Sequence, residues 1–260
     1  MFVDVHCHLT DPVYENVGVQ QIVTNATQNG VGIMINSGCC LRSSKVAQEI
    51  SRLYDNVYFC VGFHPDELHT YKDGDLEELR LLCADEKCVA VGEIGLDYHY
   101  ENNPSPSVQR ELFIKQLQLA DEVGLPVVIH SRDAAGETFA ILEEHKSLLK
   151  KGGLMHCYSY SPEMMERFLG LGFYFSFGGP STFKNAKKVK TCVEHVPGTR
   201  LLSETDCPYL TPEPYRGVFP NEPKNVKYVV ENFATLRNEK VEELEKQILQ
   251  NAKELFFRLK

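Results

Sequence analysis

Short apolar runs alternate with amphipathic segments along most of the chain. Eight runs rich in β-branched and aromatic residues predict strands at 2–6, 31–36, 57–61, 88–94, 126–130, 153–156, 172–176 and 200–203. Between them, apolar residues recur at spacings of three and four, which predicts helices over 43–53, 75–84, 107–123, 134–145, 162–170 and 182–194. Within 107–123, the expected buried face carries Val108, Leu112, Leu119 and Val123.

This alternation predicts an α/β protein, because strands separated by helices pair in parallel through right-handed crossovers. Eight such units suit closure into a (β/α)8 TIM barrel better than an open sheet. The length of 260 residues is usual for one barrel, so we expect a single domain over 1–260. The tail at 222–260 carries two further helical stretches, which we expect to pack on the outside of the barrel through Leu244, Ile248, Leu255 and Phe256.

Composition and charge narrow the class of protein. Hydrophobic residues make up 43% and charged residues 24%, as in ordinary folded proteins. Because the formal net charge is −9, we expect no strong nonspecific binding to duplex nucleic acid. A phosphate-bearing substrate would have to be held locally, by metal ions and a few basic side chains.

The cysteines and the apolar runs bear on the compartment. The nine cysteines form no Cys-x-x-Cys pair, which argues against a disulfide framework and against a zinc ribbon. The N-terminus has no signal-peptide pattern, and no apolar run approaches the roughly 18 residues of a membrane span. We therefore expect an intracellular protein, cytoplasmic or nuclear, that does not enter a membrane.

Residues of the kinds that bind metal ions stand where the predicted strands end. In a barrel of this type the reacting groups lie at the C-terminal ends of the strands. The residues in question are His6, His8, His64, Glu93, His130, His156 and Asp206.

The spacing of His6 and His8 lets both imidazoles point the same way from an extended segment, with Cys7 facing away. Taken singly, His130 and His156 are better explained as core histidines that hydrogen-bond to backbone. Several imidazoles meeting carboxylates at one mouth, however, need charge compensation, which a divalent cation supplies. Nitrogen and oxygen ligands without thiolate suit Zn²⁺, Mn²⁺ or Fe²⁺ and, less well, Mg²⁺.

Glu93 has the surroundings of a bridging ligand. Gly92 and Gly95 flank it and allow close backbone approach at the strand end. A carboxylate there can bridge two ions about 3.5–4 Å apart, which together lower the pKa of a shared water. A surface salt bridge is the less favoured interpretation, because the neighbouring residues are apolar.

The motifs resemble those of the TatD family of metal-dependent deoxyribonucleases, within the wider amidohydrolase-like barrels, over nearly the whole chain. They are Asp4-Val5-His6-Cys7-His8-Leu9, Gly62-Phe63-His64-Pro65, Gly92-Glu93-Ile94-Gly95-Leu96-Asp97-Tyr98, His130-Ser131-Arg132-Asp133-Ala134, His156-Cys157-Tyr158-Ser159 and Ser203-Glu204-Thr205-Asp206-Cys207-Pro208-Tyr209-Leu210.

The resemblance implies specific roles. It implies that one metal ion is held by His6, His8 and Asp206, the other by His130 and His156, with Glu93 as the bridge. It also implies that His64 and Arg132 contact the scissile phosphate or its neighbours. An outer salt bridge explains Arg132 equally well. After strand eight the family usually has a basic stretch before Asn-Glu-Pro, whereas Val218 and Phe219 stand there in this chain. This departure weakens the case for strong DNA affinity.

We therefore expect a metal-dependent phosphodiester hydrolase, a deoxyribonuclease that acts on single strands or strand ends, with DNA or another phosphate ester as substrate. Two divalent ions (Zn, Mn or Mg) would activate a hydroxide, and Glu93 and Asp206 would be catalytic, with Asp206 orienting the water or taking its proton. An amidohydrolase or lactonase on the same metal site is an alternative, since fold does not fix substrate. A catalytically silent binding barrel is a further alternative.

Overall fold

The computed structural model describes all 260 residues and forms one barrel of eight parallel strands in sequence order. The strands are β1 (Phe2–Cys7), β2 (Val31–Ser37), β3 (Val57–Val61), β4 (Cys88–Asp97), β5 (Val127–Arg132), β6 (Gly153–Met155), β7 (Tyr174–Phe177) and β8 (Leu201–Ser203). Each lies within three residues of its predicted limits. The predicted (β/α)8 TIM barrel is confirmed.

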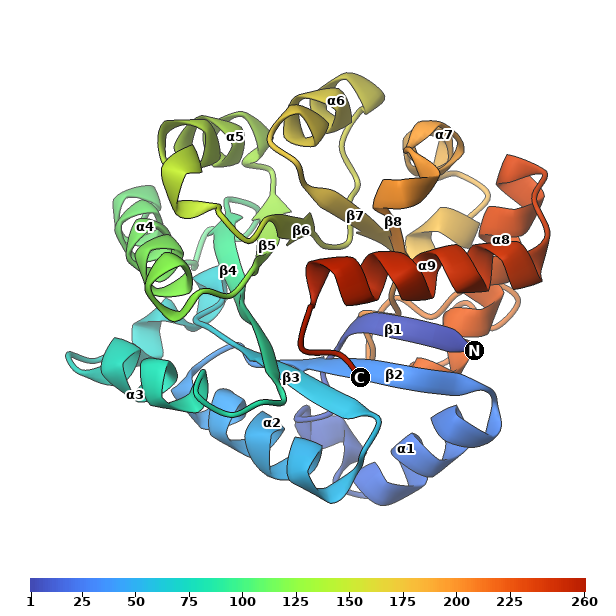
Figure 1. Ribbon diagram of the computed structural model, residues 1–260, viewed down its shortest axis with the longest axis horizontal. Coiled ribbons are helices and arrows are strands. Elements are labelled where there is room, and N and C mark those ends of the chain that lie inside the picture. Colours follow the sequence, from blue (N-terminus) through green and yellow to red (C-terminus); the bar gives the residue numbers. More distant parts are fainter.

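Helices surround the strands as an outer ring (Figure 1). They are α1 (Val19–Gln28), α2 (Leu41–Leu53), α3 (Asp75–Leu82), α4 (Pro106–Val123), α5 (Ala135–Glu144), α6 (Pro162–Gly170), α7 (Lys187–His195), α8 (Val226–Arg237) and α9 (Val241–Leu255). Short 3-10 turns are η1 (Pro12–Tyr14), η2 (Pro65–Thr70), η3 (Lys146–Leu148), η4 (Gly179–Thr182), η5 (Gly198–Arg200) and η6 (Pro223–Asn225).

Three details of the sequence-based prediction were wrong. Helix α1 was not predicted, because its buried face consists only of Ile22, Val23 and Ala26. The segment 182–194 is not one helix, since η4 and α7 are separated by a non-helical stretch. Val108 is 47% exposed because it lies in the first turn of α4, ahead of the buried face that begins at Gln109.

The tail packs against the barrel as a layer of the same core. Leu244, Ile248 and Leu255 of α9 and Phe256 after it are buried together with residues of the strands, in one continuous hydrophobic cluster. Phe233 of α8 belongs to the same cluster.

Side-chain and backbone hydrogen bonds join the first strand to the last. Asp4 accepts from the backbone N–H and the hydroxyl of Thr205 at 2.9 and 2.6 Å. The Ser203 hydroxyl donates to the Val3 carbonyl at 2.6 Å. Beyond the strands, the backbone N–H of Asp206 donates to the His6 carbonyl at 2.9 Å. This seam between β1 and β8 fixes the loop after β8 beside the end of β1.

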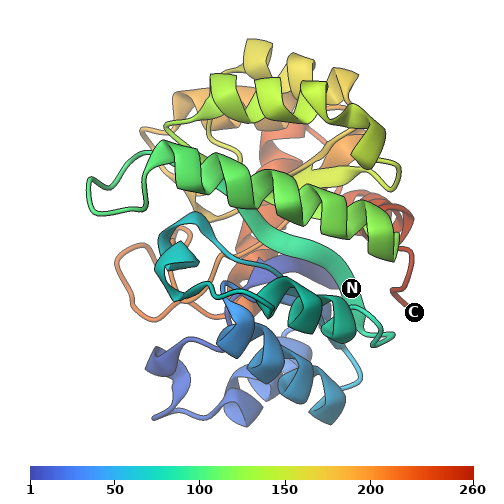
Figure 2. The ribbon, with the colours of Figure 1, turned by 90° about the vertical axis from the view of Figure 1, so that its left-hand side faces the viewer.

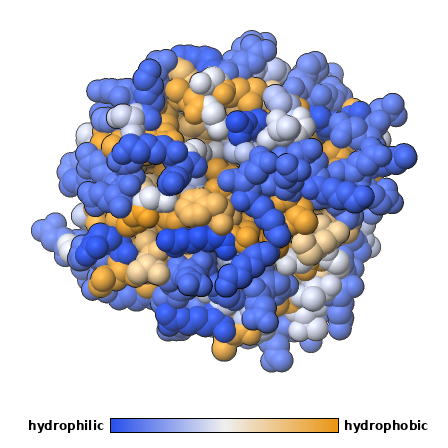
Figure 3. Space-filling model, viewed as in Figure 1, coloured by the Kyte–Doolittle hydropathy of each residue, from blue (hydrophilic) through white to orange (hydrophobic).

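The two ends of the barrel differ. In Figure 2 the termini lie at one end and long loops, including those at 98–105 and 207–222, project from the other. The end with the termini, seen in Figure 3, is covered mostly by hydrophilic residues with small hydrophobic areas between them. The loop-bearing end is the C-terminal face, where a site is expected. None of the helices is both long and apolar enough to cross a membrane.

Candidate metal centre

Two histidines of the first strand enter the barrel mouth as the spacing predicts. His6 is fully buried, and His8, just past the end of β1, is partly exposed. Cys7 between them points away, and its thiol donates to the Ile35 carbonyl at 3.3 Å. Nδ1 of His6 lies 3.1 Å from the Ser37 hydroxyl oxygen and can donate its N–H to it, which leaves the lone pair of Nε2 facing the mouth.

Glu93 stands at the centre of the cluster and divides its two oxygens between two groups of imidazoles. Oε2 lies 3.1 Å from His6 Nε2 and 3.7 Å from His8 Nε2. Oε1 lies 2.9 Å from His130 Nδ1 and 2.7 Å from His156 Nε2. The carboxylate is almost fully buried, so its two oxygens contact protein groups rather than bulk water.

Asp206 completes the first group from the loop after β8. Its Oδ1 lies 3.3 Å from His8 Nε2 and 3.9 Å from His6 Nε2. The backbone of Asp206 has φ of 54°, a left-handed conformation that is uncommon outside glycine and that occurs at functional sites. The hydrogen bond from Asp206 N–H to the His6 carbonyl, at 2.9 Å, holds this turn against β1.

Acidic residues lie behind both rings of the second group. His130 Nε2 lies 3.0 Å from the buried Asp97 Oδ2, so its Nδ1 faces Glu93. His156 Nδ1 lies 3.8 Å from the buried Glu204 Oε2 and has no hydrogen-bond partner. Glu204 itself accepts from the backbone N–H of Cys157 at 2.7 Å.

His64 and Arg132, the two residues expected to contact phosphate, differ in their position relative to the cluster. His64 joins the cluster, with Nε2 3.3 Å from Glu93 Oε1 and Nδ1 against Asp66. Arg132 lies outside it. Its guanidinium lies 4.9 Å from the centroid of the Tyr100 ring and donates to the Tyr100 hydroxyl at 3.0 Å. Arg132 lines an open cleft of about 560 Å³ and pairs with no acidic side chain.

Charges in the cluster shift the pKa values of its members. Burial opposes the ionised form of Glu93, but His156, His64 and His6 outweigh it and hold the pKa of Glu93 well below its usual value. The pKa of Asp206 is also lowered, because contact with His8 outweighs burial. Burial and the neighbouring His156 lower the pKa of His6 to about 4, so this imidazole is neutral at pH 7 with a lone pair to offer.

The donor set fits divalent cations better than it fits hydrogen bonding alone. Three ring nitrogens, from His64, His130 and His156, lie within 3.3 Å of one Glu93 oxygen. Nδ1 of His130 and Nε2 of His156 are also 3.3 Å from each other, so both cannot carry a proton without repulsion. A cation beside these two nitrogens would accept both lone pairs at once. Three trios have their ligand atoms within 4.8 Å of one another: His6, His8 and Glu93; His64, Glu93 and His130; and His6, His156 and Asp206.

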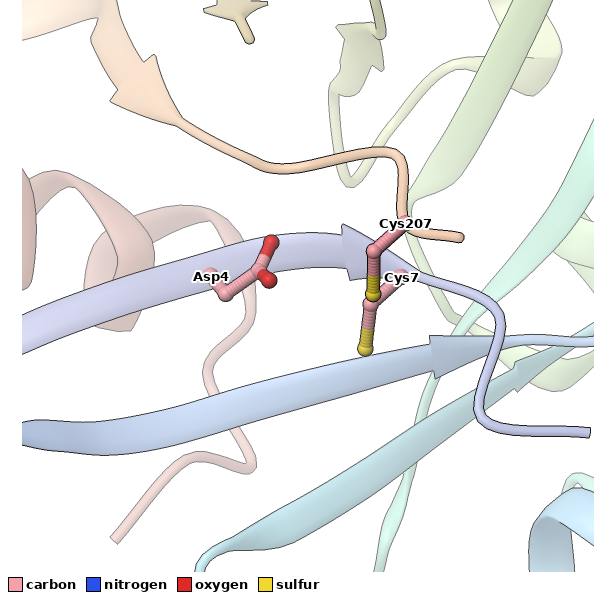
Figure 4. Close-up of side chains that lie close together, drawn as sticks. All are labelled: Asp4, Cys7 and Cys207. Atoms are coloured by element: carbon pink, nitrogen blue, oxygen red, sulfur yellow. The ribbon is translucent and has the colours of Figure 1, made fainter. Parts of the chain in front are cut away.

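A further close group, of Asp4, Cys7 and Cys207, lies where β1 meets the segment after β8 (Figure 4). Both oxygens of Asp4 accept hydrogen bonds, and burial raises its pKa to about 7. Burial also raises the pKa of the Cys7 thiol well above its usual value. Because thiolate is the form that binds metal, we interpret this group as packing that supports β1.

Sequence reasoning missed the residues that orient the ligands. Asp97, Ser37 and Glu204 hold or face the outer nitrogens of His130, His6 and His156. A signal for Asp97 was present, because it follows Glu93 by an even number of residues on the same strand and is buried at the mouth. Ser37 and Glu204 carried no comparable signal.

Comparisons with known proteins identify the family. Residues 3–257 match the family model described as TatD related DNase. The chain is 41% identical over 256 residues to the uncharacterized metal-dependent hydrolase YabD of Bacillus subtilis, covering 98% of this chain and 99% of the relative. It is 40% identical over 257 residues to YcfH of Escherichia coli, also called a metal-dependent hydrolase, with 98% and 95% covered.

Solved structures show the same architecture. The TatD homologue YjjV of Escherichia coli superposes with a TM-score of 0.92 at 32% identity and covers 98% of both chains. A TatD family hydrolase of Entamoeba histolytica superposes with a TM-score of 0.88 at 24% identity, covering 99% of this chain and 98% of the other, which shows a shared fold. With the family model spanning nearly its full length, this chain belongs to the TatD family of metal-dependent hydrolases.

Proposed function

We propose that this protein hydrolyses phosphodiester bonds of nucleic acid, as a deoxyribonuclease that acts on single strands or strand ends. The observation that carries the proposal is that the two oxygens of the Glu93 carboxylate face different groups of histidines. Oε2 faces His6 and His8, and Oε1 faces His130 and His156. Such a carboxylate suits two cations side by side, the arrangement that stabilises both the attacking and the leaving oxygen of a phosphoryl group.

In this proposal His6, His8 and Asp206 would hold one divalent ion, His130 and His156 would hold the other, and Glu93 would be shared between them. Zinc, manganese or magnesium would serve. When bound, such ions lower the pKa of a water molecule and neutralise charge on the phosphate.

Side chains of the protein would transfer the proton and contact the phosphate. The contacts of Asp206 all use Oδ1, so Oδ2 is left to accept the proton of the attacking water. The water oxygen forms a bond to phosphorus, one ester P–O bond breaks, and the departing oxygen takes up a proton. Asp66 holds Nδ1 of His64, and Glu93 and Asp66 outweigh burial to keep the pKa of His64 well above its usual value, which suits contact with a phosphate.

Arg132 would hold a phosphate neighbouring the reacting one. Its stacking on Tyr100 leaves the guanidinium at the rim of the cleft, free of any acidic partner. An arginine without a carboxylate partner at a substrate cleft favours an anionic substrate over a neutral one.

The decisive experiment measures bound metal in the purified protein and then digests end-labelled single- and double-stranded oligonucleotides, before and after chelation and reloading with zinc, manganese or magnesium. Cleavage that chelation removes and reloading restores supports the proposal. Hydrolysis of lactones or amides with oligonucleotides left intact would favour a small-molecule amidohydrolase. Less than one bound ion per chain, with no hydrolysis under any metal, would favour a binding barrel.

A further inference from the structure

Exposed hydrophobic side chains are concentrated in the loop that follows β8. Of the thirteen large hydrophobic residues of the chain that are exposed, five lie between positions 209 and 219: Tyr209, Leu210, Tyr215, Val218 and Phe219. Scattered exposed apolar residues are normal, but a contiguous group is a sign of an interaction site. Tyr209 is 52% exposed and Phe219 60%.

The exposure is not a result of a loosely held loop. The Tyr209 hydroxyl lies 3.0 Å from Asp11 Oδ2 and donates to it. The Thr211 hydroxyl donates to the Val218 carbonyl at 2.6 Å, and the Asn221 side-chain amide donates to the Tyr209 carbonyl at 2.8 Å. The backbone of Leu210 packs closely against Gly179, because a Cβ added at Gly179 would lie 1.7 Å from the Leu210 carbonyl oxygen. The aromatic rings are therefore presented by a fixed backbone.

The loop lies directly beside the candidate metal centre. The backbone N–H of Tyr209 donates to the Asp206 carbonyl at 3.1 Å, so the ring is carried by the same turn as the proposed ligand. Figure 2 shows this loop projecting from the same end of the barrel as the loop at 98–105. Both loops therefore border the mouth that contains the metal centre.

The loop offers flat apolar surface, and its basic side chains lie against other groups of the protein. The rings of Tyr209 and Phe219 have centroids 6.3 Å apart and planes inclined by 37°, which forms a shallow open angle. The one arginine of the loop, Arg216, is engaged over the Phe183 ring at 3.9 Å. Lys224, which follows the loop, pairs with Glu222.

We propose that Tyr209 and Phe219 form a stacking subsite for an unpaired nucleobase next to the phosphodiester that is hydrolysed. This inference rests on the proposed nuclease function and adds the side chains that hold an unpaired base next to the cleaved linkage. Aromatic side chains beside a phosphate-binding site are the usual means of holding single-stranded nucleic acid, because every base has a flat π-face. A base in the interior of a duplex is stacked on both faces and could not offer either one to these rings.

The test compares steady-state kinetics of the metal-loaded wild type and Phe219→Ala on two short oligothymidylates. One carries all its bases, and the other carries abasic residues on both sides of the cleaved linkage. We expect Phe219→Ala to raise KM for the complete strand about 10-fold and to leave KM for the abasic strand unchanged, with kcat altered little for either. Wild type should prefer the complete strand by a similar factor.

Phe257→Ala is the matched control. Phe257 is also an exposed phenylalanine, 49% exposed, but it lies against Lys151, which precedes β6 at the opposite end of the barrel. This variant should behave as wild type on both strands. Equal KM values for wild type and Phe219→Ala on the complete strand would overturn the subsite and leave the aromatic surface to a protein partner. A loss of similar size on both strands would overturn it as well, since the effect would then not depend on the base.

The two proposals fail separately. If no oligonucleotide is cleaved under any metal, the nuclease function is wrong. Binding of a fluorescein-labelled phosphorothioate oligothymidylate, followed by fluorescence anisotropy, then still decides whether Phe219 contacts bases. Equal affinity of wild type and Phe219→Ala in that assay overturns the subsite, and a weakened affinity that is specific to the base-containing strand supports it.

Discussion

Asp97 Oδ2 lies 3.0 Å from Nε2 of His130, and the contact fixes which nitrogen of that ring faces the centre of the barrel mouth. Nδ1 of His130 is thereby presented to Glu93 at 2.9 Å. The buried Asp97 also accepts from the backbone N–H of His99, so its own position is fixed. A carboxylate behind an imidazole in this way sets the tautomer and raises the basicity of the nitrogen that binds a metal.

Asp97→Asn should therefore weaken metal binding about 10- to 100-fold, because the amide can still accept from His99 but no longer carries the charge that orients His130. Metal titration of the chelated variant, read by calorimetry, measures the loss. Asp133→Asn is the control, since its carboxylate contacts only the exposed His99 ring. Equal affinities of Asp97→Asn and wild type would show that Asp97 has no such role.

Removal of metal should lower thermal stability by a predictable amount. A cation that binds only the folded protein stabilises it by about 2.7 kcal/mol at one hundred times its Kd. For a domain of this size that corresponds to a rise in Tm of about 5–10 °C. Scanning calorimetry of the chelated protein, with and without added zinc or manganese, measures the shift. Glu93→Gln should reduce it sharply, and an unchanged shift in that variant would exclude Glu93 as a shared ligand.

Asp206→Asn should lower kcat about 10²- to 10⁴-fold while the fold is retained, because the amide oxygen can still approach His8 but cannot take a proton from water. The rate should be measured with the variant loaded to the same metal content as wild type. Far-ultraviolet circular dichroism serves as the check on folding. A loaded variant with full activity would mean that another group accepts the proton.

Gly95 should be intolerant of any side chain. Its φ is +146°, and a Cβ would lie 1.9 Å from the His130 carbonyl oxygen on β5. Gly95→Ala should therefore destabilise the fold by about 2–4 kcal/mol through overpacking and backbone strain.

Gly136→Ala is the opposite case, because Gly136 lies in α5 with no atom within 4 Å of an added Cβ. It should stabilise the protein by about 0.5–1 kcal/mol, through the higher helix propensity of alanine. Urea unfolding of the two variants gives both values. Equal stability of Gly95→Ala and wild type would contradict the close approach of β4 to β5.

Asp85 should make stability depend on pH in the acid range. Burial raises its pKa, but hydrogen bonds from the Lys87 backbone, Gln48 and Arg52 outweigh this and hold the pKa below its usual value. A carboxyl with a lowered pKa stabilises the folded state above its ordinary pKa of about 4, and this contribution is lost as the pH falls through the folded value.

Asp85→Asn should accordingly cost about 1 kcal/mol at pH 7, with the difference from wild type narrowing as the pH falls below about 4. Denaturant unfolding over that pH range measures both free energies. A difference that stayed constant with pH would mean that the charge of Asp85 contributes nothing.

The sequence was sufficient for the barrel because each strand is a compact apolar run bounded by turn residues, and 57–61 coincides with β3. The cluster could also be anticipated, since parallel strands must bring His6, Glu93 and His130 to one end. Helix α1 was not predicted because it has few buried residues, so tertiary packing rather than an apolar pattern determines its limits.

Orientation within the site was beyond sequence reasoning. Which nitrogen of His130 faces Glu93 depends on where Asp97 lies in three dimensions, and the stacking of Arg132 on Tyr100 depends on loop geometry. Likewise, the sequence shows only that Val218 and Phe219 stand where the family usually has basic residues. Their exposure and the contact of Phe219 with Tyr209 became evident from the fold.

The seam between β1 and β8 also sets an order of events during synthesis. His6 and His8 are synthesised about 200 residues before Asp206. The hydrogen-bond partners of Asp4 and Val3, which are Thr205 and Ser203, are synthesised equally late. A nascent chain therefore carries exposed imidazoles with an incomplete set of partners until the last strand docks. Acquisition of a tightly bound cation should follow barrel closure, so loading with metal would mark the completion of the polypeptide rather than an early stage of its folding.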